Sequence, residues 1–184
     1  MQIVSLDIID STSTELKRIL DNENRKSYKF LIIADTQTNG YGTHNRSWES
    51  PLGNLYMSFN FSYDKPEHLP YFVSYALFET ISSYLYHSKN IKIKWPNDIL
   101  VNGLKIAGIL IEYFEEQYIV GIGVNLNLAP LKSSTSIRQI TKSEIRVKRD
   151  KFIVIFMKNL EKNRKKISSQ GFLQFKRMWK NVIY

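Results

Sequence analysis

Two lysines, Lys94 and Lys105, flank a short segment that contains a proline and an Asn-Gly turn. An ammonium group is a compact positive charge, and two of them directed into one cavity would hold an anionic ligand. The same side chains could instead be ordinary solvated lysines, as most lysines are. The choice depends on the elements that carry them.

The segment around the two lysines predicts three short strands. Residues 91–95 alternate enough for one strand, and Pro96 ends it because proline cannot donate to a strand ladder. Residues 99–101 and 105–113 flank Asn102-Gly103, which is the strongest short signal for a β-hairpin. The first lysine would therefore end one strand and the second would begin another, so that both ammonium groups can point into one cavity.

Three hydroxyl residues, Ser11, Thr12 and Ser13, stand between a predicted strand, residues 3–9, and a predicted helix, residues 13–24. Their side chains can cap the helix. Together with the free amides of a helix N-terminus, they can also hold an anion or the polar head of a ligand. The two roles can fall to different members of the cluster.

A polar loop, residues 35–51, follows the next predicted strand, residues 28–34. A loop of this length inside a compact domain is usually functional or disordered. Gly40 and Gly42 would let the backbone bend closely around a ligand. A Gly-x-Gly pattern alone is weak evidence for a ligand-binding loop, so this interpretation needs support from the residues around it.

The rest of the chain alternates strands with helices. We expect strands over residues 53–61 and 118–127, helices over residues 69–86, 148–167 and 171–179, and irregular structure over residues 128–143. This order of elements predicts a single α/β (α+β) domain, in which helices pack against a mixed β-sheet.

The composition excludes several classes of protein. The 184 residues suffice for one domain with a core, and no apolar run approaches the ~18 residues that span a bilayer. Asp7 comes too early for a signal peptide. The chain has no cysteine, which excludes disulfides, a thiolate nucleophile and a cysteine metal site. We therefore expect a cytoplasmic protein.

The net charge of +9 is concentrated toward the C-terminal end. From Lys142 onward there are 13 Lys/Arg and 3 Asp/Glu, whereas the first 141 residues carry 13 and 14. Such a basic part could meet nucleic acid, a phosphate-bearing ligand or an acidic partner, or it could be the solvated face of a helix. No recognition motif accompanies it, so we expect no specific nucleic-acid partner.

Three groups of residues together resemble the motifs of biotin protein ligases. The first is Lys94-Trp95-Pro96-Asn97-Asp98, followed at the proper distance by Lys105-x-Ala107-Gly108-Ile109-Leu110-x-Glu112. The second is the polar loop, with Gln37, Gly40-x-Gly42, Arg46-x-Trp48 and Ser50-Pro51-x-Gly53-Asn54-Leu55-Tyr56. The third is Gly121-x-Gly123-x-Asn125. The resemblance covers residues 3–180.

The chain departs from this family's pattern at three positions. Tyr41 and Thr43 stand where the family has loop arginines, and Ser13 stands where it has an asparagine. Tyrosine can stack or donate one hydrogen bond and threonine can donate one, but neither carries charge. We therefore expect a more mobile loop that holds the reaction intermediate less tightly.

The resemblance implies a two-step ligase. Such enzymes make biotinyl-5′-adenylate from biotin and ATP, with Mg²⁺, and then pass the biotinyl group to one lysine of a biotin carboxyl carrier protein domain, as in acetyl-CoA carboxylase. Residues 1–184 would form a single biotin/lipoate ligase-like catalytic domain, with no helix-turn-helix before it and no β-barrel after it. We expect no membrane partner, and a homodimer is left open.

The resemblance also implies roles for individual residues. The catalytic residues would be Lys105, Lys94 and Arg46. The biotin-binding residues would be Ser11, Thr12, Ser13, Gln37, Gly40, Tyr41, Gly42, Thr43, Lys105, Gly108 and Leu110. The nucleotide-binding residues would be Arg46, Trp48, Lys94, Asn97 and Asn125. We expect no metal site built from protein residues alone.

Other functions remain open on the sequence alone. A lipoate or octanoate ligase or transferase shares this fold and acylates a similar carrier lysine. A catalytically weakened biotin-binding module would keep the cavity and lose turnover. A nucleic-acid-binding protein is the third alternative, and it rests only on the basic C-terminal part.

Overall fold

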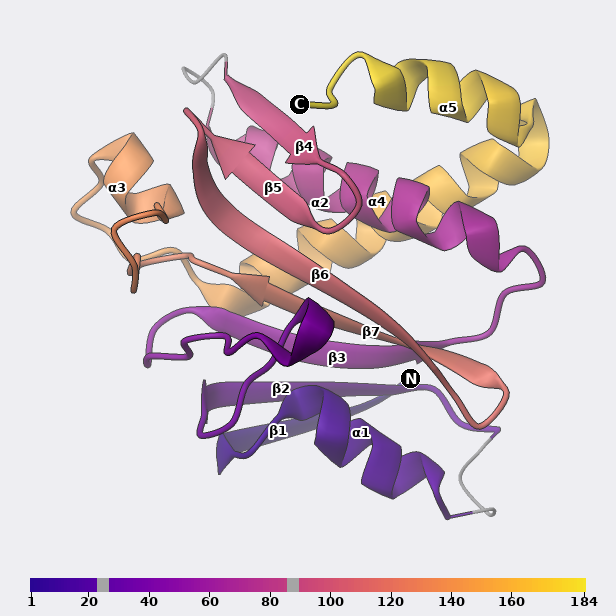
Figure 1. Ribbon diagram of the computed structural model, residues 1–184, viewed down its shortest axis with the longest axis horizontal. Coiled ribbons are helices and arrows are strands. Elements are labelled where there is room, and N and C mark those ends of the chain that lie inside the picture. The colour runs from indigo at the N-terminus through magenta and orange to yellow at the C-terminus, as the bar shows by residue number, and fades with distance from the viewer. Residues whose placement is uncertain (23–26, 86–89) are drawn as a thin grey trace.

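Seven strands form one sheet within the residues that the computed structural model describes, 1–22, 27–85 and 90–184 (Figure 1). The strands are β1 (Gln2–Ile9), β2 (Phe30–Gln37), β3 (Leu55–Phe61), β4 (Ile91–Lys94), β5 (Asp98–Val101), β6 (Leu104–Phe114) and β7 (Gln117–Val124). Their order across the sheet is β1-β2-β3-β7-β6-β5-β4. β1 and β2 are parallel and the other neighbours are antiparallel, so the predicted mixed sheet is confirmed.

Two connections follow directly from local sequence. The helix α1 (Thr12–Leu20) lies between β1 and β2, because a parallel pair needs a crossover connection. Asn102-Gly103 joins β5 to β6, with φ of 51° and 80°, values that asparagine and glycine tolerate better than other residues. The predicted hairpin is therefore confirmed.

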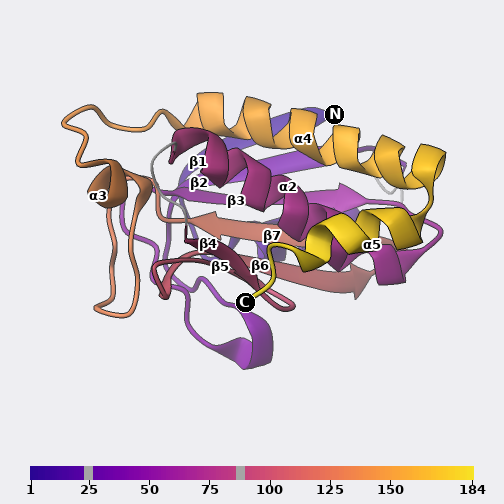
Figure 2. The same cartoon turned by 90° about the horizontal axis from the view of Figure 1, so that it is seen from above.

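The helices divide between the two faces of the sheet. Figure 2 shows α2 (Leu69–Tyr84), α4 (Arg149–Gln170) and α5 (Phe172–Lys180) together on one face. α1 packs on the opposite face, against β2, β3 and β7. The short α3 (Ile137–Thr141) lies at one end of the sheet (Figure 1). In the part of the chain that is described, no helix is both long and apolar enough to cross a membrane.

Alternation along each strand separates the core from the α1 face. In β3, Leu55, Met57 and Phe59 are buried in the larger core under α2 and α4. Tyr56 and Ser58 point the other way, because successive side chains of a strand lie on opposite faces. The same strands can therefore supply an apolar core on one side and a polar site on the other.

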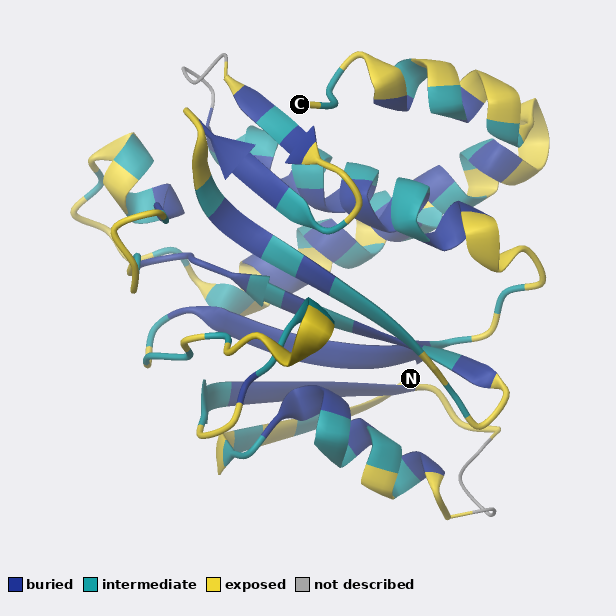
Figure 3. Cartoon of the chain, in the orientation of Figure 1, coloured by how far each residue is buried: buried dark blue, intermediate teal, exposed yellow. Residues whose placement is uncertain are grey.

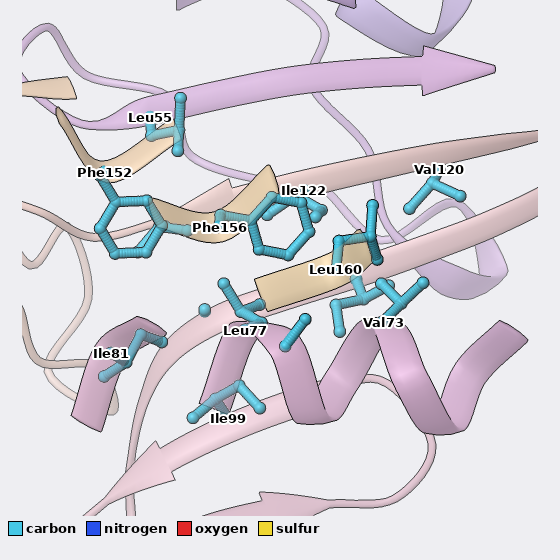
Figure 4. Packing of buried hydrophobic residues seen from close by; sticks show 14 of the residues in the cluster. Leu55, Val73, Leu77, Ile81, Ile99, Val120, Ile122, Phe152, Phe156 and Leu160 are labelled. Carbon is cyan, nitrogen blue, oxygen red and sulfur yellow. The ribbon is translucent and has the colours of Figure 1, made fainter. Parts of the chain in front are cut away.

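The larger core is dominated by aromatic and aliphatic side chains of α4 and α2. Figure 4 shows Phe152, Phe156 and Leu160 of α4 beside Leu77 of α2 and the strands behind them. Phe156 is fully buried, with its ring centroid 6.2 Å from that of Phe59. Figure 3 shows that the central strands, such as β3 and β7, are largely buried, whereas β1 at the edge of the sheet is largely exposed. Burial of this apolar area stabilises the sheet, and the stable sheet holds the residues of its opposite face, the α1 face, in position.

Four predicted strand boundaries are wrong by two residues or more. β2 begins at Phe30 instead of residue 28. β2 runs to Gln37 instead of residue 34, because Thr36 and Gln37 pair with the end of β1. The polar loop therefore begins at residue 38. β3 begins at Leu55 instead of residue 53, and β7 ends at Val124 instead of residue 127. These boundaries depend on pairing between strands that are distant in the sequence, and the local pattern of apolar residues does not reveal that pairing.

The helices differ from prediction in three respects. α4 ends at Gln170 instead of residue 167. Within the described residues the first helix ends at Leu20 and the second at Tyr84, and the predicted end residues, 24 and 86, lie outside these residues. The segment predicted as irregular, residues 128–143, contains α3, which is closed by a capping box between Ser136 and Gln139. A helix of only five residues shows too little periodicity to be predicted.

Phe156 and Val154 of α4 allow a matched test of this core. Phe156→Ala should lower the free energy of unfolding by about 3–5 kcal/mol, because it leaves a cavity in a fully buried site. Val154 is 53% exposed, so Val154→Ala should change it by less than about 0.5 kcal/mol. Urea unfolding followed by circular dichroism measures both. Equal effects of the two substitutions would contradict the assignment of the core face.

Candidate functional site

A cavity lies on the α1 face of the sheet, and its floor is almost bare of side chains. Gly108 of β6 pairs directly with Gly123 of β7, and Asp98 of β5 pairs with Gly108. Two residues further along, Gly121 pairs with Leu110. Because glycine has no Cβ, the backbone itself forms the floor, so a ligand or a large side chain can approach it closely.

A cluster of hydroxyl groups closes one end of the cavity. The hydroxyl oxygen of Ser58 lies 2.8 Å from that of Thr12 and 2.9 Å from that of Ser13. The backbone N–H of Thr12 donates to Gln37 Oε1 over 2.9 Å. The cluster joins α1 to β2 and β3, and it presents hydrogen-bonding groups with fixed positions to the cavity.

The cluster at the start of α1 serves both purposes that its sequence suggested. Ser11 is the N-cap residue, and its hydroxyl accepts a 3.4 Å hydrogen bond from the N–H of Thr14. Ser11, Thr12 and Ser13 also line the cavity. Capping and a position at the cavity therefore coincide in this segment.

Residues 38–50, which we call the lid, fold back on themselves above the floor. The N–H of Gly42 donates to the carbonyl of Arg46 over 2.8 Å, and the N–H of Trp48 donates to that of Gly40 over 2.9 Å. A single 3₁₀ turn, Thr43–Asn45, closes this small hairpin. The lid residues that line the cavity are Tyr41, Gly42, Thr43 and Trp48.

Two residues of the lid with predicted ligand roles do not line the cavity. A Cβ on Gly40 would stand 2.7 Å from Gln37 Nε2 and 2.8 Å from the carbonyl oxygen of Trp48, so close packing of the lid accounts for this glycine. Arg46 is exposed, and its guanidinium donates to the carbonyl and hydroxyl oxygens of Thr43, both over 3.3 Å. Their contacts with a ligand stay predictions.

The indole of Trp48 lies on the paired glycines of the floor. A Cβ on Gly123 would stand 2.4 Å from the indole, and a Cβ on Gly108 would stand 2.8 Å from it. The Nζ of Lys105 lies 5.0 Å from the ring centroid, within the range of a cation–π interaction. Trp48 Nε1 is buried and has no hydrogen-bond partner among the described residues. A bound ligand with an acceptor could supply one.

Lys105 reaches the cavity and Lys94 does not. Lys105 Nζ lies 2.7 Å from Asp98 Oδ1, and both residues line the cavity. Lys94 pairs with Asp98 in the strand register but stands on the outermost strand, β4, and is exposed. The expected convergence of two ammonium groups is therefore not seen in this conformation, and the catalytic role of Lys94 stays a prediction.

A second cavity lies on the other side of Trp48 and Lys105, which line both cavities. Asn125 lines it and is buried, with its amide N–H donating to the carbonyl of Thr135 over 3.1 Å and its Oδ1 without a partner in the described chain. The segment after β7 completes it with Pro130, Leu131, Ser133 and Ser134. Trp48 and Lys105 are therefore common to the two cavities.

The structure gathers most of the predicted residues, and adds some. The predicted residues that line the first cavity are Ser11, Thr12, Ser13, Gln37, Tyr41, Gly42, Thr43, Trp48, Asn97, Lys105, Gly108 and Leu110. The sequence did not select Ser58, although a serine among apolar residues of a buried strand was a signal. Gly121 and Gly123, which belong to the Gly-x-Gly-x-Asn motif found in the sequence, also line the cavity. Among the described side chains, no group of three or more His, Cys, Asp or Glu could hold a metal ion.

Comparison with known proteins agrees with this geometry. Residues 5–128 match the model of the biotin/lipoate A/B protein ligase family. Biotin–protein ligase 2 of Arabidopsis thaliana is 31% identical over 162 residues, which are 81% of this chain and 49% of that protein. The bifunctional ligase/repressor BirA of Bacillus subtilis is 30% identical over 189 residues, 95% of this chain and 57% of that protein. The chain thus spans about half the length of the curated relatives it matches.

A solved structure extends the similarity to three dimensions. The biotin protein ligase of Aquifex aeolicus, in complex with biotin and ATP, superposes with a TM-score of 0.85 at 28% identity. The match covers 99% of this chain and 78% of that one.

The contact between Trp48 and the bare floor predicts the effect of one methyl group. Gly123→Ala should displace the indole, because its Cβ would stand 2.4 Å from it, and overpacking of this kind costs about 1–3 kcal/mol. Gly42→Ala is the matched control, since its Cβ would meet nothing closer than 3.8 Å. With 5-fluorotryptophan at the three tryptophans, ¹⁹F NMR should show a shift of the Trp48 resonance in the first variant only. An unshifted resonance in Gly123→Ala would contradict the contact.

Proposed function

The chain belongs to the biotin/lipoate A/B protein ligase family, and we propose that it activates biotin with ATP and transfers the biotinyl group to a lysine of a carrier domain. The observation that carries the proposal is the position of Lys105, which lines both cavities. One cavity suits a small molecule with a polar head and an acidic tail, and the other suits a nucleotide. A single ammonium group can then serve both substrates.

Biotin would lie across the glycine floor. Its ureido head would meet the hydroxyl cluster, where Thr12, Ser13 and Gln37 provide donors and acceptors. Its carboxylate would point toward Lys105. A cavity in which several polar groups with fixed positions converge on a bound molecule is typical of small-molecule sites.

ATP would occupy the second cavity. Its base would contact Trp48, and the unpartnered Oδ1 of Asn125 would accept a hydrogen bond from it. This arrangement would bring the α-phosphate to Lys105 from the side opposite to biotin. Asn97, which lines the first cavity, keeps its predicted place among the nucleotide contacts as part of the proposal.

In the first step, a carboxylate oxygen of biotin would attack the α-phosphorus of ATP, and the bond to pyrophosphate would break. Two anions must approach each other, so the ammonium of Lys105 would neutralise charge on both and stabilise the transition state. Without substrates this ammonium pairs with Asp98 over 2.7 Å, which holds it at the cavity. In the second step, the amine of a carrier lysine would attack the biotinyl carbonyl, with loss of a proton and release of AMP.

Mg²⁺ belongs to the proposal because it normally accompanies ATP. Magnesium usually keeps several waters and binds through one or two carboxylates and substrate phosphates. Asp98 is a carboxylate at the cavity and would supply one ligand to a metal held mainly by the phosphates of ATP. Lys94 and Arg46, both exposed, would contact the departing pyrophosphate.

The remaining parts of the proposal come from the family resemblance. The acceptor would be a biotin carboxyl carrier protein domain of acetyl-CoA carboxylase, and the reaction would take place in the cytoplasm. We propose biotin over lipoate or octanoate because the relatives reported above are named for biotin.

The direct test is transfer of labelled biotin to a purified biotin carrier domain, with ATP and Mg²⁺. We expect labelled carrier and one pyrophosphate per biotin activated, and no comparable labelling by lipoate or octanoate. Biotin binding without pyrophosphate release would contradict the enzyme and favour a binding module. Preferential use of lipoate or octanoate would contradict the substrate.

Lys105→Ala should lower the rate of pyrophosphate release by ~10²–10³, as loss of one charge-stabilising group typically does. Lys158→Ala removes the same charge from an exposed position of α4, on the opposite face of the sheet, and should keep the wild-type rate. A folded Lys105→Ala variant that releases pyrophosphate as fast as the wild type would refute the assigned role.

A further inference from the structure

Tyr41 of the lid makes contacts that its sequence position did not suggest. Its hydroxyl accepts a 3.2 Å hydrogen bond from Lys17 Nζ of α1 and donates a 3.1 Å hydrogen bond to Glu112 Oε2 of β6. Lys17 Nζ also lies 2.7 Å from Glu112 Oε1. The three side chains therefore form a closed ring of contacts, which joins the lid to a helix and to a strand.

The ring of contacts is partly sheltered from water. The side chains of Lys17 and Glu112 are 27% and 25% exposed. Burial alone would lower the pKa of Lys17, but the hydrogen bonds to Glu112 and Tyr41 outweigh burial and raise the pKa above its ordinary value. Lys17 is therefore charged at neutral pH, and hydrogen bonds to charged groups are stronger than those between neutral groups.

The ring lies beside the cavity, beyond the hydroxyl cluster. Glu112 shares a face of β6 with Gly108 and Leu110, because alternate residues of a strand point the same way. Lys17 lies one helical turn after Ser13, on the same side of α1. Tyr41 itself lines the cavity. Its hydroxyl therefore fixes the lid at the end of the cavity that is far from Lys105.

Other contacts hold the opposite side of the lid. Gln37 Nε2 donates to the hydroxyl of Ser50 over 3.0 Å, and that hydroxyl donates to the carbonyl of Trp48 over 2.9 Å. Trp48 rests on the glycine floor. Since these contacts do not involve Tyr41, loss of its hydroxyl should release one side of the lid without unfolding it.

We propose that Tyr41 is a latch: its hydroxyl, held by Lys17 and Glu112, keeps the lid closed and sets how fast a bound ligand escapes. Tyr41 acts here as a positioning residue, through its hydroxyl. The identity of the retained ligand, biotinyl-adenylate, rests on the function proposed above. The latch itself can be tested without any ligand.

Hydrogen–deuterium exchange of the ligand-free protein tests the latch. The amides of Gly42 and Trp48 report on the lid, because each is bonded to another lid residue. In Tyr41→Phe both should exchange about tenfold faster, the effect expected from losing hydrogen bonds to charged groups at a partly exposed site. Tyr113→Phe removes a hydroxyl from a 66% exposed tyrosine of β6 and should change neither amide. Unchanged exchange in Tyr41→Phe would overturn the proposal.

A double-variant comparison separates a latch from general loosening. Glu112→Leu should accelerate the exchange of the same two amides to the same extent. The double variant, Tyr41→Phe with Glu112→Leu, should exchange these amides no faster than either single variant. Effects that add fully would mean that the two side chains act independently, which would overturn the latch. Amides of α4 should keep their wild-type exchange in all variants, because this helix packs on the other face of the sheet.

The release of ligand provides the second readout. Dissociation of biotinyl-adenylate should be about tenfold faster from Tyr41→Phe than from wild type, in proportion to the faster opening of the lid. Faster amide exchange with an unchanged rate of dissociation would refute the claim that the latch sets how fast the ligand escapes. If the wild-type protein binds neither biotin nor its adenylate, the proposed function fails, whereas the exchange data still decide whether the latch exists.

Discussion

The site depends on one steric constraint, the absence of side chains at Gly108 and Gly123, where two neighbouring strands meet. Their bare backbone lets the indole of Trp48 lie within 3 Å of where a Cβ would stand. The indole in turn separates the two cavities and supports the ammonium group of Lys105. A single methyl group at either glycine would therefore displace the indole of Trp48, and with it the ammonium group of Lys105 and the shape of both cavities.

The sheet tolerates two glycines without side chains because one of its faces forms the core and the other forms the site. Ala107 is buried in the core with α2 and α4, whereas Gly108 and Leu110, on the opposite face of β6, line the cavity. The apolar face provides the stability, and so the other face can carry glycines, hydroxyls and a charged pair that contribute little to it. The charged pair is also only partly buried, so desolvation costs less than in a core.

The sequence predicted much of the fold and of the cavity lining, since both rest on local patterns. Asn102-Gly103 specifies its hairpin, and alternation identifies the core face of β3. The outermost position of Lys94 could not be predicted, because strand order depends on pairing between distant segments. The ring of Lys17, Tyr41 and Glu112 was missed for the same reason: these residues lie far apart in the chain and meet only when α1, the lid and β6 are assembled. The expected mobility of the lid stays a prediction. The hydrogen bonds of Tyr41 to Lys17 and Glu112 would reduce that mobility.

A crystal structure of the protein with biotin would test the central claim most directly. The account predicts the ring system over Gly121, within hydrogen-bond distance of Thr12 or Gln37, and the carboxylate within reach of Lys105 Nζ. Biotin bound elsewhere, for example in the groove lined by Tyr84, Arg146 and Lys148, would contradict it. So would biotin in the predicted cavity with its carboxylate turned away from Lys105.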